Sequence, residues 1–98
     1  MALRGTHKRH LRGLAHHLSP IVHVGKAGLT EAIVQATDQA LTDHELVKVR
    51  LPQVPKGERK ALAASIEERT NADLAGLTGR VAIFYRRHPD EPTIKLPK

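Results

Sequence analysis

Residues 21–31 read Ile-Val-His-Val-Gly-Lys-Ala-Gly-Leu-Thr-Glu, and they contain the signals for a strand, a loop and a helix in succession. The β-branched residues at the beginning of the stretch predict a short strand over residues 21–24. Thr30 followed by Glu31 is typical of a helix start. A Thr hydroxyl accepts a hydrogen bond from a free helix N–H, and an acid suits the positive end of the helix dipole. The stretch therefore predicts a strand-to-helix connection made by Gly25-Lys26-Ala27-Gly28.

The Gly25–Gly28 tetrapeptide has the residue types of a loop that holds a phosphate backbone. Two glycines let a ligand approach the main chain closely, Ala27 is too small to block it, and Lys26 adds a positive charge. The start of the following helix offers free N–H groups to the same anion. GxxG loops clamp nucleic-acid backbones, although two glycines between a strand and a helix are often only a turn. The spacing fits neither a Walker loop nor the dinucleotide GxGxxG, which argues against a nucleotide-binding enzyme.

Outside this stretch, hydrophobic periodicity predicts helices over residues 7–18, 31–42 and 57–70. Ser19-Pro20 ends the first of them, because proline has no N–H to donate and restricts the residue before it. We expect each apolar face to be buried against a sheet. The residues expected to face inward are Leu11, Leu14, Ala15 and Leu18 in the first helix, Ile33, Ala36, Ala40 and Leu41 in the second, and Leu62, Ala63 and Ile66 in the third.

Alternating apolar and polar residues predict the remaining strands. Residues 46–51 form one strand, in which Lys48 and Arg50 lie on the face opposite to Val47 and Val49. Residues 73–77 and 80–86 form a hairpin, and residues 94–96 add a short edge strand. The order α-β-α-β-α-β-β, with right-handed crossovers, predicts an α/β domain with a four-stranded mixed sheet. Its first three strands are parallel to one another, and the hairpin adds an antiparallel fourth.

The length of 98 residues allows one hydrophobic core. We therefore expect a single domain over residues 1–98, with residues 96–98 as a loose tail. No apolar run approaches the roughly 20 residues of a membrane-spanning helix. No apolar signal segment follows the N-terminal charges, so we expect a cytoplasmic protein that does not bind membranes.

The formal net charge of +6 is distributed unevenly along the chain. The first thirty residues contain Arg4, Lys8, Arg9, Arg12 and Lys26 and no acid, whereas residues 31–47 contain acids and no Lys or Arg. Basic residues again outnumber acids from Lys48 onward. Such segregation predicts a positive side that attracts polyanions, although solubility alone also explains a basic surface.

The composition argues against most kinds of enzyme and metal site. The absence of Cys excludes a disulfide framework and a thiolate site. His7, His10, His16 and His17 lack a Cys or nearby acid to complete a ligand set, and Ser19 and Ser65 lack the surroundings of a catalytic nucleophile. Phe84 and Tyr85 alone do not make an aromatic platform for stacking RNA bases. We expect no catalytic residue, metal, cofactor or small-molecule substrate.

Several motifs in one order resemble the YhbY-like ribosome-associated proteins, the bacterial stand-alone form of the CRM domain. The resemblance covers nearly the whole chain and is far more specific than any one motif. Its residues are Leu11-Arg12-Gly13-Leu14-Ala15-His16, Pro20-Ile21-Val22, Gly25 to Glu31, His44-Glu45-Leu46-Val47-Lys48-Val49, Gly79 to Arg86 and Ile94-Lys95-Leu96-Pro97. The chain departs from the pattern at Pro52-Gln53-Val54-Pro55, which leaves the place of Lys56, Arg59 and Lys60 open.

This resemblance implies a fold similar to the C-terminal domain of translation initiation factor three. It also implies RNA binding through the GxxG loop and association with precursors of the large ribosomal subunit during assembly. The alternative is a protein-interaction adaptor that docks through its acidic helix, residues 31–43. The expected RNA-binding residues are Gly25, Lys26, Ala27 and Gly28 in the loop and Lys8, Arg12, Lys48, Arg50 and Arg86 on the neighbouring basic surface.

Overall fold

The helices and strands follow one another in the order that the sequence predicts, and the computed structural model describes residues 3–97. The first two residues of the expected domain and residue 98 of its expected tail lie outside this range. The elements are α1 (Gly5–Ala15), β1 (Val22–His23), α2 (Glu31–His44), β2 (Leu46–Arg50), α3 (Lys56–Thr70), β3 (Asp73–Thr78) and β4 (Val81–Tyr85).

The four strands form one mixed sheet in the order β1-β2-β4-β3. Strand β1 pairs parallel with β2, while β4 lies between β2 and β3 and is antiparallel to both. The first three strands therefore run in the same direction and the fourth runs against them, as the sequence predicts. The hairpin inserts its second strand next to β2, so that β4 occupies the centre of the sheet.

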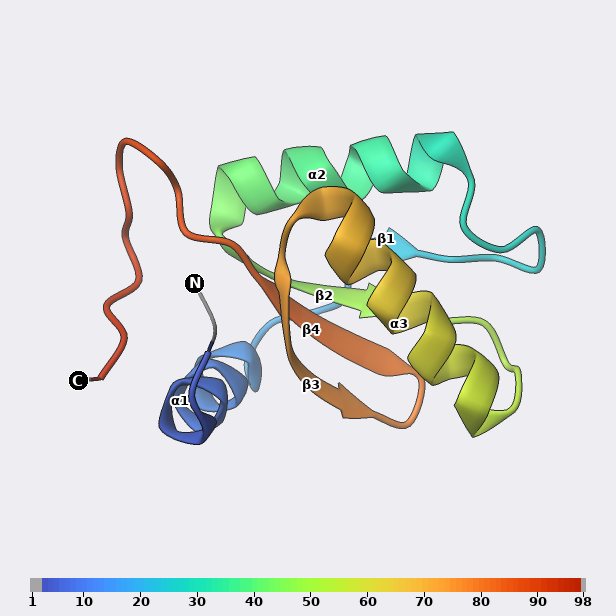
Figure 1. Cartoon of the computed structure of the whole chain (residues 1–98), viewed down its shortest axis with the longest axis horizontal. Helices are drawn as coiled ribbons and strands as arrows, with labels where there is room; N and C mark the ends of the chain where they lie inside the picture. Colours follow the sequence, from blue (N-terminus) through green and yellow to red (C-terminus); the bar gives the residue numbers. More distant parts are fainter. Residues whose placement is uncertain (1–2, 98) are drawn as a thin grey trace.

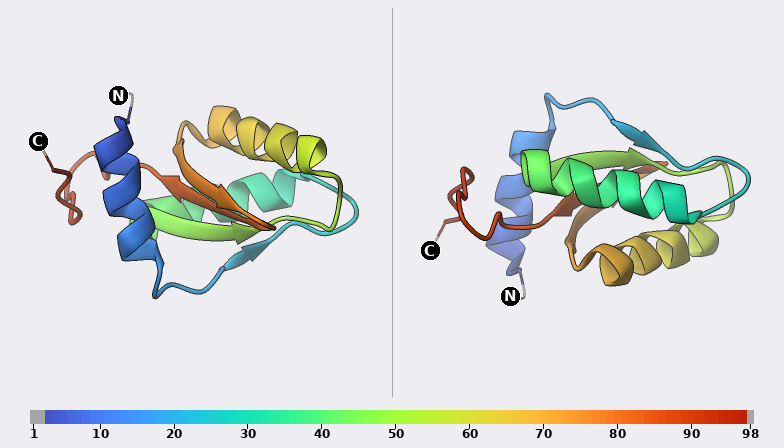
Figure 2. Two further views of the ribbon diagram at one scale, coloured as in Figure 1. Left: turned by 90° about the horizontal axis from the view of Figure 1, so that it is seen from below. Right: turned by 90° about the horizontal axis from the view of Figure 1, so that it is seen from above.

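The helices cover the two faces of the sheet unequally. Helices α2 and α3 pack on one face, and α1 crosses one end of the opposite face (Figures 1 and 2). Because successive strand residues point to opposite faces, β4 contributes to two separate cores. Ala82 and Phe84 join the core under α2 and α3, whereas Ile83 and Tyr85 join the core under α1.

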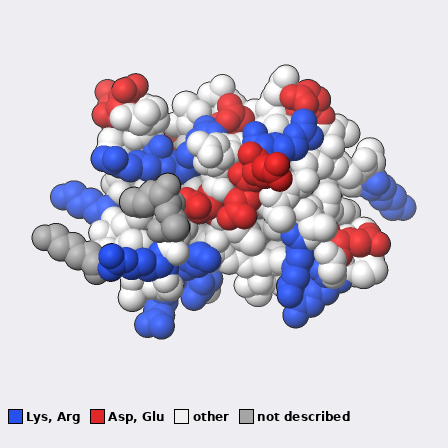
Figure 3. Space-filling view, viewed as in Figure 1, with Lys and Arg blue, Asp and Glu red and all other residues white. Residues whose placement is uncertain are grey.

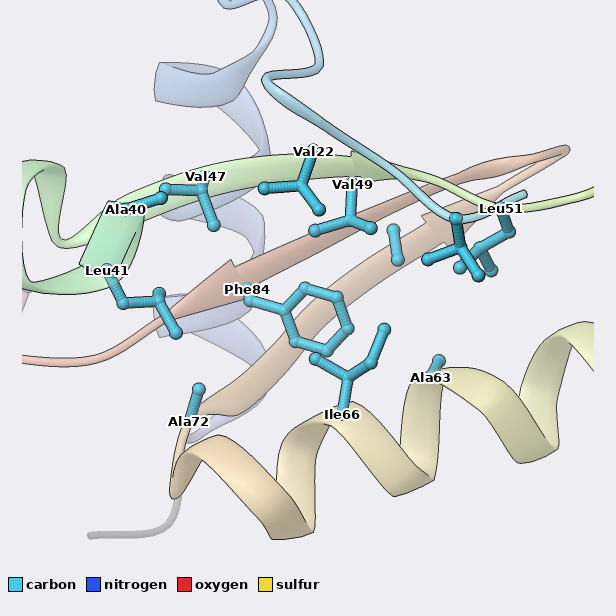
Figure 4. Packing of buried hydrophobic residues seen from close by; sticks show 12 residues of the cluster. Val22, Ala40, Leu41, Val47, Val49, Leu51, Ala63, Ile66, Ala72 and Phe84 are labelled. Atoms are coloured by element: carbon cyan, nitrogen blue, oxygen red, sulfur yellow. The ribbon is translucent and has the colours of Figure 1, made fainter. Parts of the chain in front are cut away.

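Phe84 lies at the centre of the larger core. Its ring is fully buried and lies close to Ile66 of α3 in the close-up of Figure 4, with Val49 of β2 and Leu41 of α2 on its other sides. The third helix buries Ala63 and Ile66 as predicted, and Leu62 packs against the edge of the same core.

In α2 the expected inward position Ala36 is wrong, because Ala36 is exposed. The buried residues of this helix are Val34, Thr37, Ala40 and Leu41. Thr37 is fully buried although it is polar, because its hydroxyl donates a hydrogen bond to the Ile33 carbonyl at 2.8 Å. Ile33 is half-buried at the margin of the core.

In α1 the expected burial of Leu14 and Leu18 is also wrong. Their side chains are exposed by 43% and 41%, and only Leu11 and Ala15 of this helix are buried. The helix ends at Ala15, where hydrogen bonds between residues three apart, from His16 N–H to Gly13 O and from Leu18 N–H to Ala15 O, replace the four-residue helical pattern. Leu18 therefore lies outside the helix whose face it was expected to extend.

Residues 94–96 do not form the expected edge strand. The N–H groups of Thr93 and Ile94 donate to Glu45 Oε1, and the N–H of His88 donates to Glu45 Oε2. Glu45, at the junction of α2 and β2, therefore accepts hydrogen bonds from N–H groups at the start of this segment, including that of Ile94, which a strand would have used for pairing. Ile94 and Leu96 still pack against the core under α1.

Candidate nucleic-acid interface

The Gly25–Gly28 tetrapeptide forms an exposed turn at one end of the molecule. Val24 fixes its beginning, because this residue is buried and its N–H donates to Arg50 O at 2.8 Å. The N–H of Gly28 then donates to Gly25 O at 3.0 Å and closes the turn. Lys26 and Ala27 lie exposed at its tip, in the β1–α2 connection seen at the right-hand end of Figure 1.

The two glycines of the turn differ in what the chain itself requires of them. Gly28 has a φ of 79°, a conformation that favours glycine, whereas Gly25 is not among the positive-φ residues. Among the described residues, nothing lies within 4 Å of the position that a Cβ would take at either glycine. The backbone of the turn is therefore open to a ligand, and within residues 3–97 neither backbone conformation nor packing requires a glycine at position 25.

The start of α2 offers less to an anion than the sequence suggests. Thr30 caps the helix, and its Oγ1 accepts from Ile33 N–H at 3.3 Å. Glu31 follows with a carboxylate that pairs with Arg69 of α3 at 2.5 Å. One helix donor is thus occupied and a negative charge lies beside the others, which leaves Lys26 as the exposed cation of the turn.

The expected cations of α1 and β2 come together on the sheet face that α1 leaves open. In the view from below, α1 crosses one end of the sheet and the strands beyond it are uncovered (Figure 2, left). A hollow of about 330 Å³ lies there. Arg50 pairs with Val81, whose side chain lines this hollow, and Lys8 precedes Arg12 by one helical turn. The lining residues are Arg12, His16, Lys48, Thr78, Val81 and Ile83.

Two of these cations are held in place by the main chain. The Arg12 guanidinium donates from Nη1 to Ala75 O at 3.1 Å, and its stem lies across Gly76, where a Cβ would come within 2.7 Å of Arg12 Cδ. Lys48 Nζ donates to Leu18 O at 3.0 Å. Both side chains remain partly exposed, so they present fixed positive charge on the open face.

The structure places Arg86 away from this surface. Its guanidinium lies between α2 and the end of α3, where Nη1 contacts Asp38 Oδ1 at 2.6 Å and Thr70 O at 2.7 Å. Nη2 donates to Asp38 O and to Thr42 Oγ1, both at 2.9 Å. With these four contacts, the Arg86 guanidinium links α2 and the end of α3 to the end of β4.

Acids and cations are mixed on the side of the molecule that α2 and α3 cover. On the face shown in Figure 3, acidic side chains lie over the upper and middle part together with some Lys and Arg, and the lower edge bears Lys and Arg. Two of these acids are neutralised within the chain, since Glu31 pairs with Arg69 and Asp38 pairs with Arg86. On the open sheet face, Arg12 and Lys48 line the hollow and form no ion pair with another described residue, so this face carries unpaired positive charge.

A second hollow, of about 400 Å³, lies beside the turn and was missed by sequence reasoning. The signal that could have found it is the spacing of Glu58, Ala61, Leu62 and Ser65, which puts the four residues on one face of α3. Arg59, whose place the sequence left open, holds the connecting segment by donating to Val54 O at 2.8 Å, while Lys56 and Lys60 are exposed. The lining residues are Lys26, Gly28, Pro52, Val54, Glu58, Ala61, Leu62 and Ser65.

The described residues offer little for other chemistry. Within residues 3–97, no three His, Asp or Glu side chains come together as they would around a metal ion. None of the helices in that range is both long enough and apolar enough to cross a membrane.

Comparison with known proteins adds independent evidence. The sequence profile of the CRS1 / YhbY (CRM) domain matches residues 3–86. A protein of Pseudomonas aeruginosa named "Probable RNA-binding protein" is 36% identical over 91% of this chain and 86% of its own length. A Bacillus subtilis protein of the same description is 32% identical over 97% of this chain and 99% of its own.

A solved structure resembles this one closely. The solution structure of a hypothetical protein of Staphylococcus aureus, described as a candidate RNA-binding protein, superimposes with a TM-score of 0.87. It is 35% identical and covers 98% of this chain and 100% of its own. Neither this protein nor the two relatives is named as an enzyme.

Proposed function

The chain belongs to the CRS1 / YhbY (CRM) domain family, and from that premise we propose that it is a cytoplasmic, non-enzymatic RNA-binding protein that assists assembly of the large ribosomal subunit. The names of its relatives support RNA as the partner. Its resemblance to ribosome-associated proteins supports precursor ribosomal RNA as the particular RNA. In this proposal the chain holds the sugar-phosphate backbone and leaves base pairing to the RNA.

The observation that carries the proposal is the open Gly25–Gly28 turn. Its backbone is uncovered, and its tip bears the exposed Lys26. Gly25 has neither a positive φ nor a described neighbour within 4 Å of a Cβ that would require a glycine there. A phosphate that approached the turn would meet exposed main chain and one positive charge in the same place. The turn would therefore position an RNA strand without selecting its sequence.

The open sheet face supplies the second part of the proposed interface. Arg12 and Lys48 line one hollow there, Lys8 precedes Arg12 by one helical turn, and Arg50 pairs with Val81 of the lining. Four cations on one face add affinity that falls steeply as salt rises, because each phosphate contact releases condensed counterions. We leave Arg86 out of the interface, since its guanidinium is used within the fold.

The adaptor alternative has less support from the structure. Along α2, Glu31 and Asp38 are paired with arginines of the same chain, and Asp43 accepts a hydrogen bond from Gln39 at 3.0 Å. An acidic face whose charges are already partnered offers a weak attraction to a basic protein.

A sedimentation experiment separates the two functions. Tagged protein is expressed in cells, and lysate is run on a sucrose gradient before and after complete RNA digestion. We expect the protein to sediment with precursor large subunits and to move to the top of the gradient after digestion. Sedimentation with ribosomal protein complexes that survives digestion would favour the adaptor and contradict RNA binding.

A further inference from the structure

The hollow beside the Gly25–Gly28 turn has a composition that suits a nucleobase. Most of its lining is apolar, from Pro52 and Val54 of the β2–α3 segment and from Ala61 and Leu62 of α3. Two polar side chains of α3 lie at separate positions along the same helix face, Glu58 in the first turn and Ser65 two turns later. A volume of about 400 Å³ is within the range of sites that hold small ligands.

The hollow is continuous with the proposed backbone-binding turn. Lys26 and Gly28 belong to the turn and also line the hollow, so one wall of the hollow is the turn itself. A strand of RNA whose phosphate lay on the turn would carry the attached base toward α3. No aromatic side chain lies in the lining, and apolar contact with Pro52, Val54 and Leu62 takes the place of stacking.

We propose that this hollow binds one unpaired base of a single-stranded RNA segment and that Glu58 makes it prefer guanine. The proposal rests on the RNA binding proposed above and adds a base-reading site to it. A carboxylate only accepts hydrogen bonds, so it selects a base edge that donates. Guanine presents two adjacent donors, N1–H and the N2 amino group, whereas adenine and cytosine present one amino group and uracil presents N3–H between two carbonyl oxygens.

The placement of Glu58 gives this choice its physical basis. The side chain is exposed, it lines the hollow, and it makes neither a salt bridge nor a hydrogen bond with other described residues. Its carboxylate therefore has free acceptors that uracil carbonyls would repel and that guanine donors would satisfy. Contacts of this kind specify a base, whereas contacts with phosphate do not.

The test uses labelled RNA octamers in fluorescence anisotropy at low salt. One octamer contains only uridine, and three others carry a single central guanosine, adenosine or cytidine. We expect the wild-type protein to bind the guanosine octamer about 5- to 30-fold more tightly than the all-uridine octamer, the discrimination of one good two-donor contact. Equal affinity for all four octamers would overturn the proposal.

Two variants with matched controls locate the effect. Glu58→Gln should bring the ratio of guanosine to uridine affinity close to one and leave the all-uridine Kd within about twofold. The control is Glu68→Gln, because Glu68 is exposed on the same helix but lies outside the hollow; this variant should leave the ratio of guanosine to uridine affinity unchanged. Ala61→Leu narrows the hollow and should abolish the preference, whereas Ala64→Leu, exposed one turn away, should not. A ratio that persists in Glu58→Gln or Ala61→Leu would contradict the assignment.

The outcome also separates this proposal from the one on which it rests. Lys26→Ala should weaken all four octamers by a similar factor, because Lys26 contacts phosphate. If Lys26→Ala weakens binding and the base ratio of the wild type is one, the backbone-binding turn stands and the base site falls. If Lys26→Ala, Gly25→Ala, Glu58→Gln and Ala61→Leu all bind like the wild type, both proposals fall.

Discussion

Gly25 and Gly28 lie three residues apart in one turn, and the structure gives them different roles. The left-handed φ of 79° at Gly28 shapes the turn, while the conformation of Gly25 is open to any residue. A methyl group at Gly25 would meet nothing within 4 Å among the described residues. A side chain at Gly25 would therefore hinder a ligand that approaches the turn, but it would not clash with other described residues of the protein.

Substitutions at the two glycines can therefore distinguish a structural role, expected for Gly28, from a binding role, expected for Gly25. We expect Gly25→Ala to change the free energy of unfolding by less than about 0.5 kcal/mol. Its RNA affinity should fall at least about fivefold, a loss of about 1 kcal/mol. Gly28→Ala should lower the free energy of unfolding by about 1–2 kcal/mol, because an L-residue is strained at positive φ. Urea unfolding and RNA titration of the two variants measure both effects, and unchanged RNA affinity in a well-folded Gly25→Ala would show that the turn does not contact RNA.

Burial at single residues shows where sequence patterns mislead. Apolar spacing favours Ala36 as an inward residue of α2, yet Thr37 takes that place. The pattern treats Thr as polar, but its hydroxyl bonds to the helix carbonyl four residues earlier and leaves only a methyl group to be packed. Leu14 is apolar and has the correct spacing, yet it is exposed, and the residues of α1 that are buried against the sheet are Leu11 and Ala15.

At the scale of elements, one carboxylate joins the α2–β2 junction to the C-terminal segment. Glu45 is 2% exposed, has a φ of 62°, and accepts hydrogen bonds from His88 N–H, from Thr93 N–H and Oγ1–H, and from Ile94 N–H. Burial alone would raise the pKa of this carboxyl group, but the hydrogen bonds from Thr93, His88 and Ile94 outweigh burial and lower the pKa to about 2. The charged form is therefore the one that the fold stabilises.

The lowered pKa predicts how stability depends on pH. Because the folded pKa lies below the ordinary value of 4.5, the contribution of Glu45 is fully present above about pH 4.5 and is lost as the pH falls toward 2. We expect Glu45→Gln to lower the free energy of unfolding by about 2–3 kcal/mol at pH 6, since hydrogen bonds to a charged group are lost. The difference between variant and wild type should shrink at pH 3. Urea unfolding at both values measures it, with Glu68→Gln as an exposed control, and a difference that stays constant with pH would contradict this role of Glu45.

The same carboxylate explains why the end of the chain was predicted wrongly. The alternation in Ile94-Lys95-Leu96 is that of an edge strand, and both apolar residues do face a core. What the local pattern does not contain is an acceptor some fifty residues earlier that takes the donors of Thr93 and Ile94. Elements whose boundaries depend on local sequence signals, such as α2 and the β3–β4 hairpin, agree closely with prediction. The C-terminal segment does not, because its conformation depends on hydrogen bonds to a residue far away in the sequence.

At the scale of the whole molecule, the fold decides which charged side chains pair with each other and which remain unpaired on the surface. Glu31 and Asp38 pair with arginines on the side of the sheet that α2 and α3 cover, whereas Arg12 of α1 and Lys48 of β2 line the hollow on the other face. Segregation along the chain predicts a positive side, and the strand alternation predicts that Lys48 and Arg50 share a face. The position of Arg86 was not predictable, because its partners come from α2 and α3.

The salt dependence of RNA binding tests the central claim most directly, namely that Lys26 at the tip of the Gly25–Gly28 turn contacts phosphate. The measurement compares wild type, Lys26→Ala and Lys95→Ala, in which the same charge is removed from the C-terminal segment at the other end of the molecule (Figure 1). We predict that Lys26→Ala makes the negative slope of log K against log salt less steep by about 0.7 for a single-stranded RNA and weakens binding. Lys95→Ala should retain the slope. Equal slopes in wild type and Lys26→Ala would contradict the account and leave the tetrapeptide as a turn between a strand and a helix.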